Sequence, residues 1–214
     1  MNYIDILNNQ KIIDIYNKID KVNNEPFNHG MKHINNVCNI MNELCNILNI
    51  DKDMKDALLI ASALHDIGQV EGSLEHGFRA VQYIKDNYNE ELNNNKYYND
   101  ILNAVELHSN DSKEDDSLFT ILLQAADKFD FTKNRLEDNY KDKYDYFFTE
   151  EILKLEFIYD ETNFGINIIT TDKPNFEELF FGLKFFHRVI NIINVLSNKL
   201  DRKPIIKHNN KKIY

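Results

Sequence analysis

The stretch Ala-Ser-Ala-Leu-His-Asp-Ile-Gly-Gln, residues 61–69, decides the fold of this chain. An apolar run over residues 58–64 leads directly into His65 and Asp66, and Gly68 then interrupts the helix that this run predicts. A carboxylate at the end of a buried helix is costly unless it is paired or bound to a metal. Because adjacent side chains on a helix point about 100° apart, His65 cannot simply neutralise Asp66. The stretch therefore predicts either a metal site or a capped helix end.

The composition is that of one acidic domain. Of the 214 residues, 43% are hydrophobic, which suits a single domain with a sizeable core. The net charge of −10 argues against a basic face that binds nucleic acid or an anionic membrane. No stretch approaches the roughly 20 apolar residues of a membrane span, and residues 1–11 lack the apolar core of a signal peptide.

The two cysteines indicate the redox compartment. Cys38 and Cys45 are expected on one helix, two turns or about 10 Å apart, which is too far for a disulfide. They are therefore interpreted as buried thiols in a reducing compartment. Together with the composition, this predicts a cytoplasmic protein without a nucleic-acid or membrane partner.

Hydrophobic residues recur at helical spacing through the first two thirds of the chain. The expected helices cover residues 34–48, 52–66, 74–88, 97–109 and 118–129, after one or two short pieces within residues 1–22. Asp51 is expected to cap the second of these helices. The polar residues 89–95 are expected to form a solvated loop, and residues 131–148 a further helix.

The pattern changes near residue 148. Apolar and polar residues alternate over residues 153–160 and 166–170, on either side of a turn, which predicts a β-hairpin. Asn175 and Glu178 resemble a capping box at the start of a final helix expected over residues 176–199. The basic tail after this helix is expected to be loose. The predicted fold class is therefore mainly α, with a small C-terminal hairpin and helix.

Four histidines and two aspartates recur at predicted helix ends or on apolar helical faces. They are His33, His65, Asp66, His76, His108 and Asp127. Any one of them alone is an ordinary core or surface residue, but their recurrence in one helical segment favours a metal site. Imidazole and carboxylate suit Fe, Mn or Zn, and the cysteines are not placed to hold a structural zinc.

This set resembles the HD-domain metal-dependent phosphohydrolase superfamily, whose pattern is H…HD…D, and its dinuclear branch, H…HD…H…H…D. The order and the local sequences both match, over roughly residues 27–135. The resemblance implies an HD-type helical bundle over residues 1–148. Residues 149–214 would then be a C-terminal hairpin and long helix packed on the same core.

The resemblance also implies two divalent transition metals per chain, Fe or Mn, with Zn, Co, Ni and Mg left open. One metal would be held by His33, His65, Asp66 and Asp127. Asp66 would bridge to a second metal held by His76 and His108. The two cations would activate a water and neutralise charge on phosphate oxygens. The implied catalytic residues are His65, Asp66 and Lys128.

The implied activity is hydrolysis of a nucleotide-like phosphoester or phosphoanhydride, with dinucleoside polyphosphates and nucleoside monophosphates both open as substrates. Arg79, Lys128 and Arg135 are candidates for contacts to this small anionic substrate. Two alternatives use the same core: a mixed-valence di-iron oxygenase and a non-catalytic nucleotide-binding module. The aromatic-rich final helix could also pair two chains as a homodimer.

Two positions qualify the resemblance. Many family members have a lysine where this chain has Gln69, which puts the activation of the substrate in doubt. His29 precedes His33 by one helical turn and could be mistaken for the ligand. His33 is preferred because Ile34 and Val37 follow it as the family pattern expects, and His29 is interpreted as a helix-start residue or one that supports a ligand.

Overall fold

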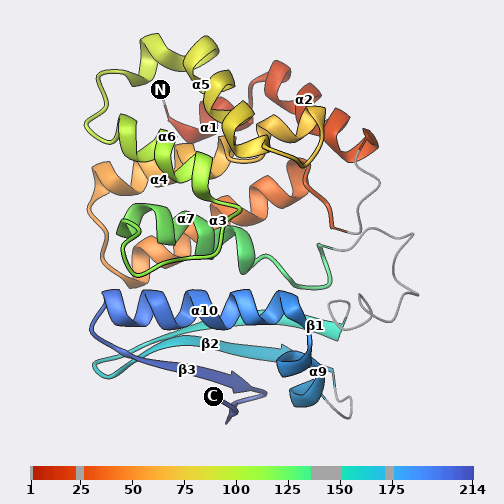
Figure 1. The fold of residues 1–214 in the computed structure, drawn as a ribbon, viewed down its shortest axis with the longest axis vertical. Coiled ribbons are helices and arrows are strands. Elements are labelled where there is room, and N and C mark those ends of the chain that lie inside the picture. Colours follow the sequence, from red (N-terminus) through yellow and green to blue (C-terminus); the bar gives the residue numbers. More distant parts are fainter. Residues whose placement is uncertain (1, 23–26, 136–150, 172–175) are drawn as a thin grey trace.

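Helix α4 (Lys52–Leu64) lies at the centre of the helical part of the molecule (Figure 1). The structure is a computed structural model that describes residues 2–22, 27–135, 151–171 and 176–214. The Asp51 side chain caps α4 by accepting a hydrogen bond from the Met54 amide, as predicted. Residues 57–64 are all buried, because α4 packs against α1, α3, α6 and α7. The apolar run thus places its last residues inside the bundle.

The other helices of this part follow in chain order. They are α1 (Tyr3–Leu7), α2 (Gln10–Val22), α3 (Met31–Ile47), the short 3-10 helix η1 (Ile67–Glu71), α5 (His76–Leu92), α6 (Tyr98–Leu107) and α7 (Leu118–Lys128). Each of α3, α5 and α6 buries one face, as the 3.6-residue spacing of its apolar side chains predicts. Helix α7 is instead buried on all sides.

A four-stranded sheet and two helices form the C-terminal part. The elements are β1 (Ile152–Tyr159), β2 (Asn163–Thr170), α9 (Phe176–Gly182), α10 (Lys184–Lys199), β3 (Lys203–His208) and β4 (Lys211–Lys212). The strands lie in the order β1-β2-β3-β4, and the β2–β3 pair is parallel while the other two pairs are antiparallel. The predicted mainly-α fold with a C-terminal hairpin is therefore confirmed.

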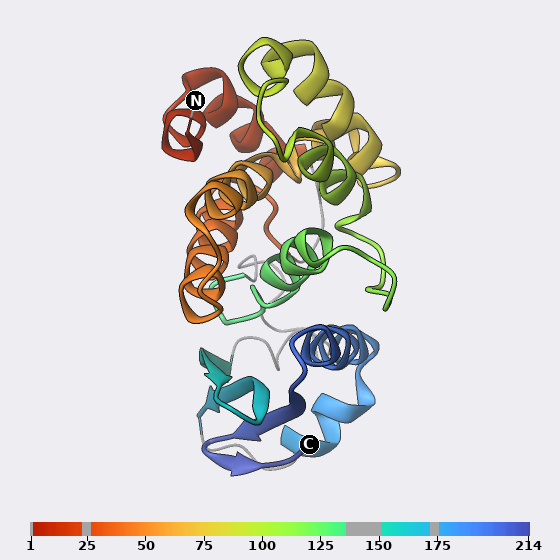
Figure 2. The ribbon, with the colours of Figure 1, turned by 90° about the vertical axis from the view of Figure 1, so that its left-hand side faces the viewer.

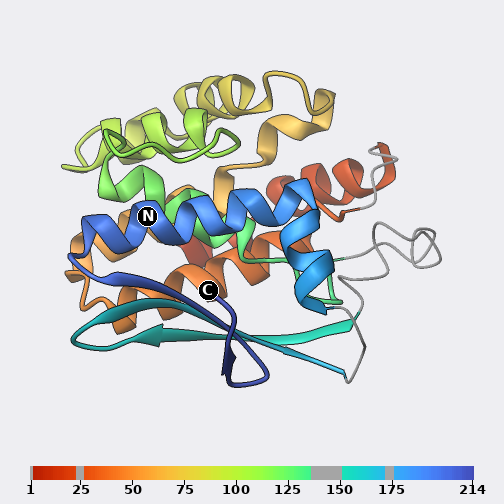
Figure 3. The same cartoon turned by 60° about the horizontal axis from the view of Figure 1, so that its bottom comes forward.

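Helix α10 lies between the sheet and the helical part (Figure 2). One side packs on α7, and the other covers β2 and β3, as Figure 3 also shows. Its buried apolar residues, from Phe186 to Leu196, belong to the same hydrophobic core as α3, α4 and α7. The apolar face of α10 is therefore covered within the chain. This packing holds α10 beside the end of α7.

Three sequence-based expectations were wrong. Helix α5 continues to Leu92 through part of the predicted loop at 89–95, because Tyr88 and Leu92 are buried. The final helix is broken into α9 and α10, which are bent by 83° at the extended Leu183. The tail is not loose: it forms β3 and β4, because Ile205 and Ile206 are buried in the sheet. The predicted helix over 131–148 and the predicted cap at Asn175 lie largely or wholly outside the described residues.

Two further findings concern the cysteines and the length of the helices. Cys38 and Cys45 are both free and buried, as their spacing predicts, and burial raises the pKa of the Cys38 thiol to about 12.

In the described parts of the chain, no single helix is long and apolar enough to cross a membrane. The bent pair α9–α10 reaches that standard by length and composition only.

Gly68 allows η1 and the start of α5 to pack closely together. A Cβ atom at this position would lie 2.1 Å from the His76 carbonyl oxygen and 2.6 Å from the Ala80 nitrogen, and both are rigid backbone atoms. We expect Gly68→Ala to lower the free energy of unfolding by about 1–3 kcal/mol, as overpacking does. Urea unfolding checks this. Gly182→Ala is the matched control, since a Cβ there meets no atom of the described residues within 4 Å. An equal loss in both variants would contradict the explanation.

Candidate metal centre

The six residues predicted as metal ligands all lie at helix ends. In chain order they are His33 in the first turn of α3, His65 at the C-cap of α4, Asp66 just after it, His76 as the first residue of α5, His108 at the C-cap of α6 and Asp127 in the last turn of α7. The structure brings them together at one point. The four histidines are 8% exposed or less and Asp66 is 1% exposed, so water does not solvate them freely.

Each of the four imidazoles is oriented by a contact to its Nδ1 atom. His33 Nδ1 lies 2.7 Å from the Asp130 carboxylate. The other three contact backbone carbonyl oxygens: His65 contacts Ser62 at 2.8 Å, His76 contacts Ser73 at 2.6 Å, and His108 contacts Val105 at 2.7 Å. A carbonyl or carboxylate partner places the proton on Nδ1. The Nε2 atoms are then left as lone-pair donors, which is the arrangement that metal-binding histidines use.

The Nε2 atoms converge on the two oxygens of Asp66. Oδ1 lies 3.2 Å from His108 Nε2 and 3.4 Å from His76 Nε2. Oδ2 lies 3.5 Å from His33 Nε2 and 3.6 Å from His65 Nε2. Asp66 therefore divides the imidazoles into two pairs, one on each side of its carboxylate.

Asp127 completes the group on the Oδ2 side. Its Oδ1 lies 3.3 Å from His33 Nε2 and 3.8 Å from His65 Nε2. On the other side, the Nε2 atoms of His76 and His108 are 2.9 Å apart. Two imidazoles whose other nitrogen carries the proton repel at such a distance unless something lies between or beside them. The arrangement therefore suits a cation on each side of Asp66.

Two unsatisfied atoms test whether the residues fit a metal. Among the residues that the structure describes, the Nε2 atoms of His33 and His65 have no hydrogen-bond partner, although both atoms are buried. A buried polar atom left in this state is costly, and such atoms call for an explanation. His33, His65 and Asp127 form one group: each offers one ligand atom, and these three atoms lie within 4.8 Å of one another. The nitrogen and oxygen donors fit Fe, Mn or Zn, and we conclude that the site fits a divalent metal.

The charges of the centre favour metal binding at neutral pH. Burial would raise the pKa of Asp66, but the surrounding histidines, His29 among them, hold it well below its usual range. Burial would likewise raise the pKa of Asp127, but Lys128 and His33 hold it low. Burial lowers the pKa of His65 to about 3, so this ring is neutral. Ionised carboxylates and neutral imidazoles are the ligand forms that a metal requires. Asp66, Asp127 and His65 have these forms, whereas for His76 the contact to Asp66 outweighs burial and raises the pKa.

Lys128, predicted as a catalytic and substrate-binding residue, lies beside the centre and is buried. Its Nζ donates to the His108 carbonyl oxygen at 2.5 Å and to Asp127 at 3.3 Å. Burial lowers the pKa of this ammonium, and Asp127 offsets part of the effect. Arg135 is also buried, and it contacts His33 and the Asp130 carboxylate. Both cations therefore hold residues of the centre in place.

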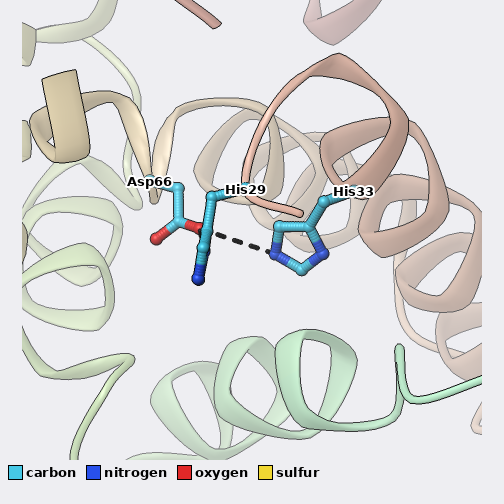
Figure 4. Close-up of side chains that lie close together, drawn as sticks. All are labelled: His29, His33 and Asp66. Carbon is cyan, nitrogen blue, oxygen red and sulfur yellow. Dashed lines mark hydrogen bonds and ion pairs between the residues drawn. The ribbon is translucent and has the colours of Figure 1, made fainter. Parts of the chain in front are cut away.

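His29 lies close to Asp66 (Figure 4), and Gln69 also contacts this carboxylate. His29 Nδ1 is 2.7 Å from Asp66 Oδ2, and Gln69 Nε2 donates to Asp66 Oδ1 at 3.1 Å. Gln69 Nε2 also lies 2.9 Å from His29 Nδ1. Both His29 and the preferred His33 thus approach Asp66, and His33 also meets Asp127. Gln69 contributes a neutral donor at this point.

A cavity of about 220 Å³ opens onto the centre. The predicted ligands that line it are Asp66, His76, His108 and Asp127, and Lys128 and Arg135 line it as well. Arg79 is not among the lining residues that the structure describes. Its guanidinium donates instead to the carbonyl oxygens of Gly68, Gly72 and Leu74, so it holds the loop that leads to His76.

Some residues of the site were missed by reasoning from the sequence. Asp130 lies three residues after Asp127, on the same side of the helix end, and that spacing could have indicated it. Phe27, Phe185 and Arg188 also line the cavity. The last two come from α10, and no motif near the ligands points to them.

The fold and the centre together define a class of protein: a helical bundle with a buried His/Asp site for divalent metal. Residues 30–132 match the family model of the HD domain. The chain belongs to the HD-domain superfamily, whose members bind divalent metals and are mostly metal-dependent phosphohydrolases. A comparison with curated proteins found no match.

Removing the Asp130 carboxylate is expected to weaken metal binding. Asp130 orients His33 through Nδ1, and the loss of such a partner typically costs about 10–100-fold in metal affinity. We therefore expect Asp130→Asn to raise the Kd for Mn²⁺ by about that factor, measured by competition with a chelating dye. Asp53→Asn, on the exposed start of α4, is the matched control. An unchanged Kd in Asp130→Asn would show that His33 does not need this partner.

Acid is expected to destabilise the metal-free protein. The pKa of His65 falls from 6.5 to about 3 on folding, so below pH 6.5 the unfolded chain takes up a proton that the folded protein does not. This contribution to stability is fully present above pH 6.5 and is lost as the pH falls toward 3. The free energy of unfolding then decreases by up to about 1.4 kcal/mol per pH unit. Urea unfolding at a series of pH values should show a smaller slope in His65→Asn. An equal slope would contradict this assignment.

Proposed function

We propose that this protein is a phosphohydrolase with two divalent metals, and that it cleaves a nucleotide-like phosphoester or phosphoanhydride. The observation that carries the proposal is the division of the imidazoles by Asp66. Its Oδ2 faces His33 and His65, and its Oδ1 faces His76 and His108. A carboxylate with ligand nitrogens on both sides is suited to bridge two cations, with Asp127 completing the first set.

The residues of this chain have separate roles in the proposed reaction. Bound metals would supply Lewis acidity, lowering the pKa of a water and neutralising charge on phosphate oxygens. Asp66 would be a ligand of both metals, and His65 would be a ligand of one of them. Lys128 would stabilise the Asp127 carboxylate and add positive charge beside the phosphate. The low pKa values of Asp66 and Asp127 keep these groups ionised at neutral pH.

The cavity supports a small anionic substrate. Three cations line it, namely Lys128, Arg135 and Arg188, and two phenylalanines, Phe27 and Phe185, also line it. Positive charge beside apolar surface suits a phosphate joined to an organic group. We also propose a cytoplasmic location, which the free, buried Cys38 and Cys45 support.

The first experiment is to count metals on protein purified anaerobically. The proposal expects about two Fe or Mn per chain and release of phosphate from a nucleotide panel without oxygen. Oxygen uptake that depends on a polyol or a phosphonate, without phosphate release, would favour an oxygenase instead. Saturable nucleotide binding without turnover at full metal occupancy would favour a binding module. One metal per chain would overturn the dinuclear part alone.

A further inference from the structure

The cavity over the metal centre has a second wall, which comes from the C-terminal part of the chain. Asp66, His76, His108 and Asp127 form the side on which the metals would lie. Helix α10 contributes Phe185 and Arg188 to the same cavity, and α10 is held there by its packing on α7. Residues outside the HD match therefore help to form the candidate site.

Arg188 is held at the cavity by the loop that follows α6. Its Nε donates to Asp111 Oδ1 at 2.7 Å, and its Nη2 donates to the Ser109 carbonyl oxygen. Ser109 directly follows His108, so the guanidinium is fixed next to a predicted metal ligand. Within the described parts of the chain, Nη1 has no hydrogen-bond partner. A guanidinium with a free donor at an anion site is suited to bind a phosphate oxygen.

The other two cations of the cavity have different partners. Lys128 is 4% exposed, and its ammonium contacts the His108 carbonyl oxygen and Asp127. Arg135 is 7% exposed and contacts Asp130 and His33. The Arg188 side chain is 35% exposed, so a ligand can reach it. Of these three cations, Arg188 is therefore the one best placed to contact a substrate directly.

Phe185 adds an aromatic surface beside Arg188. Its ring stacks on Phe27, with centroids 5.9 Å apart and planes at 25°, and meets Phe131 edge-on at 5.8 Å. These contacts hold the half-buried ring at the cavity. Aromatic rings at a phosphate site bind flat organic groups through their faces and edges.

The cavity itself encloses only a small group. Pockets that enclose a whole ligand usually have about 300–1,000 Å³. The cavity here has about 220 Å³, which accommodates a phosphate and the adjoining part of an organic group. A polyphosphate chain with an organic group at each end would extend well outside it.

We propose that α10 completes the substrate site: Arg188 binds the phosphate of a phosphomonoester, and Phe185 packs against a flat organic group such as that of a nucleoside monophosphate. This inference rests on the proposed phosphohydrolase function and names its substrate class. Arg188 and Phe185 are substrate-binding residues, so their loss should act on KM and on ligand affinity more than on kcat.

The test compares three variants of the full-length, Mn²⁺-loaded protein. Arg188→Gln removes the charge, and Phe185→Leu removes the aromatic ring. The control, Lys184→Gln, removes an exposed charge from α10 one helical turn before Arg188. Calorimetry measures the Kd of inorganic phosphate. Steady-state kinetics measure the KM of a nucleoside monophosphate and of glycerol phosphate. Thermal unfolding confirms that each variant is folded.

We expect Arg188→Gln to weaken phosphate binding and raise both KM values by about tenfold, as the loss of a charge-assisted contact does. Phe185→Leu should raise the KM of the nucleoside monophosphate by about fivefold and leave phosphate and glycerol phosphate unchanged. Lys184→Gln should behave as wild type.

Two results would overturn the inference. One is an unchanged phosphate Kd in Arg188→Gln, and the other is an equal effect of Phe185→Leu on both esters. If wild type hydrolyses no ester, the proposed function fails separately. In that case the Kd of phosphate and of the intact nucleoside monophosphate still decides the roles of Arg188 and Phe185.

Discussion

Asp66→Ala should remove both metals and reduce phosphate release by on the order of 10³-fold, while the protein stays folded. Asp66 is the residue that both pairs of imidazoles share, since its two oxygens face opposite pairs. Lewis-acid stabilisation of a transition state is worth several kcal/mol, and about 4 kcal/mol corresponds to about 10³-fold in rate. His65→Ala should act in the same direction, because it removes a ligand from one metal. Steady-state turnover and metal analysis of the purified variants provide the measurement.

The control for this prediction must separate loss of metal from loss of fold. Asp53→Ala removes an aspartate from the exposed start of the same helix that carries His65, and it should keep both metals and full turnover. Circular dichroism should give the same helical signal for all three variants. Near wild-type turnover in Asp66→Ala or His65→Ala would refute the assignment of the site.

His76→Ala should remove one metal and leave the other. His76 faces the Oδ1 side of Asp66, where its Nε2 lies 2.9 Å from that of His108, whereas Asp127 lies beside His33 and His65. The first set, on the Oδ2 side, does not include it. We therefore expect about one metal per chain and a fall in turnover of about 10²-fold, because one of two cations no longer stabilises the phosphate.

Metal analysis and turnover at saturating Mn²⁺ test this second prediction. His187→Ala, which removes an exposed imidazole from α10, should change neither quantity. Loss of both metals in His76→Ala would mean that the two cations bind only together. Retention of both would assign His76 to a supporting role and leave His108 as the main nitrogen ligand on that side.

The contribution of α10 links the two parts of the chain. In the HD match, residues 30–132 supply the ligands of the candidate centre. Arg188 and Phe185 lie outside that match but line the same cavity. Substrate preference can therefore change through α10 while the metal ligands stay the same, and the Arg188 and Phe185 variants test this directly.

The sequence alone determined the helical bundle and its six candidate ligands. The apolar run before His65 and Asp66 could only be buried, and helical spacing put His33, His108 and Asp127 near helix ends or buried faces. These are local properties, which depend on residues within a few turns of each other. The same local reasoning predicted the hairpin and the separation of the two cysteines.

Only the tertiary structure decided how these pieces meet. Which oxygen of Asp66 faces which imidazole depends on the packing of α3, α4, α5 and α6, and no spacing along the chain encodes it. The bend at Leu183 and the strand β3 follow from burial of Phe186 and Ile206 against elements far away in sequence. Arg188 reaches the cavity because α10 packs on α7. Long-range packing, which local periodicity does not specify, therefore set the shape of the candidate site.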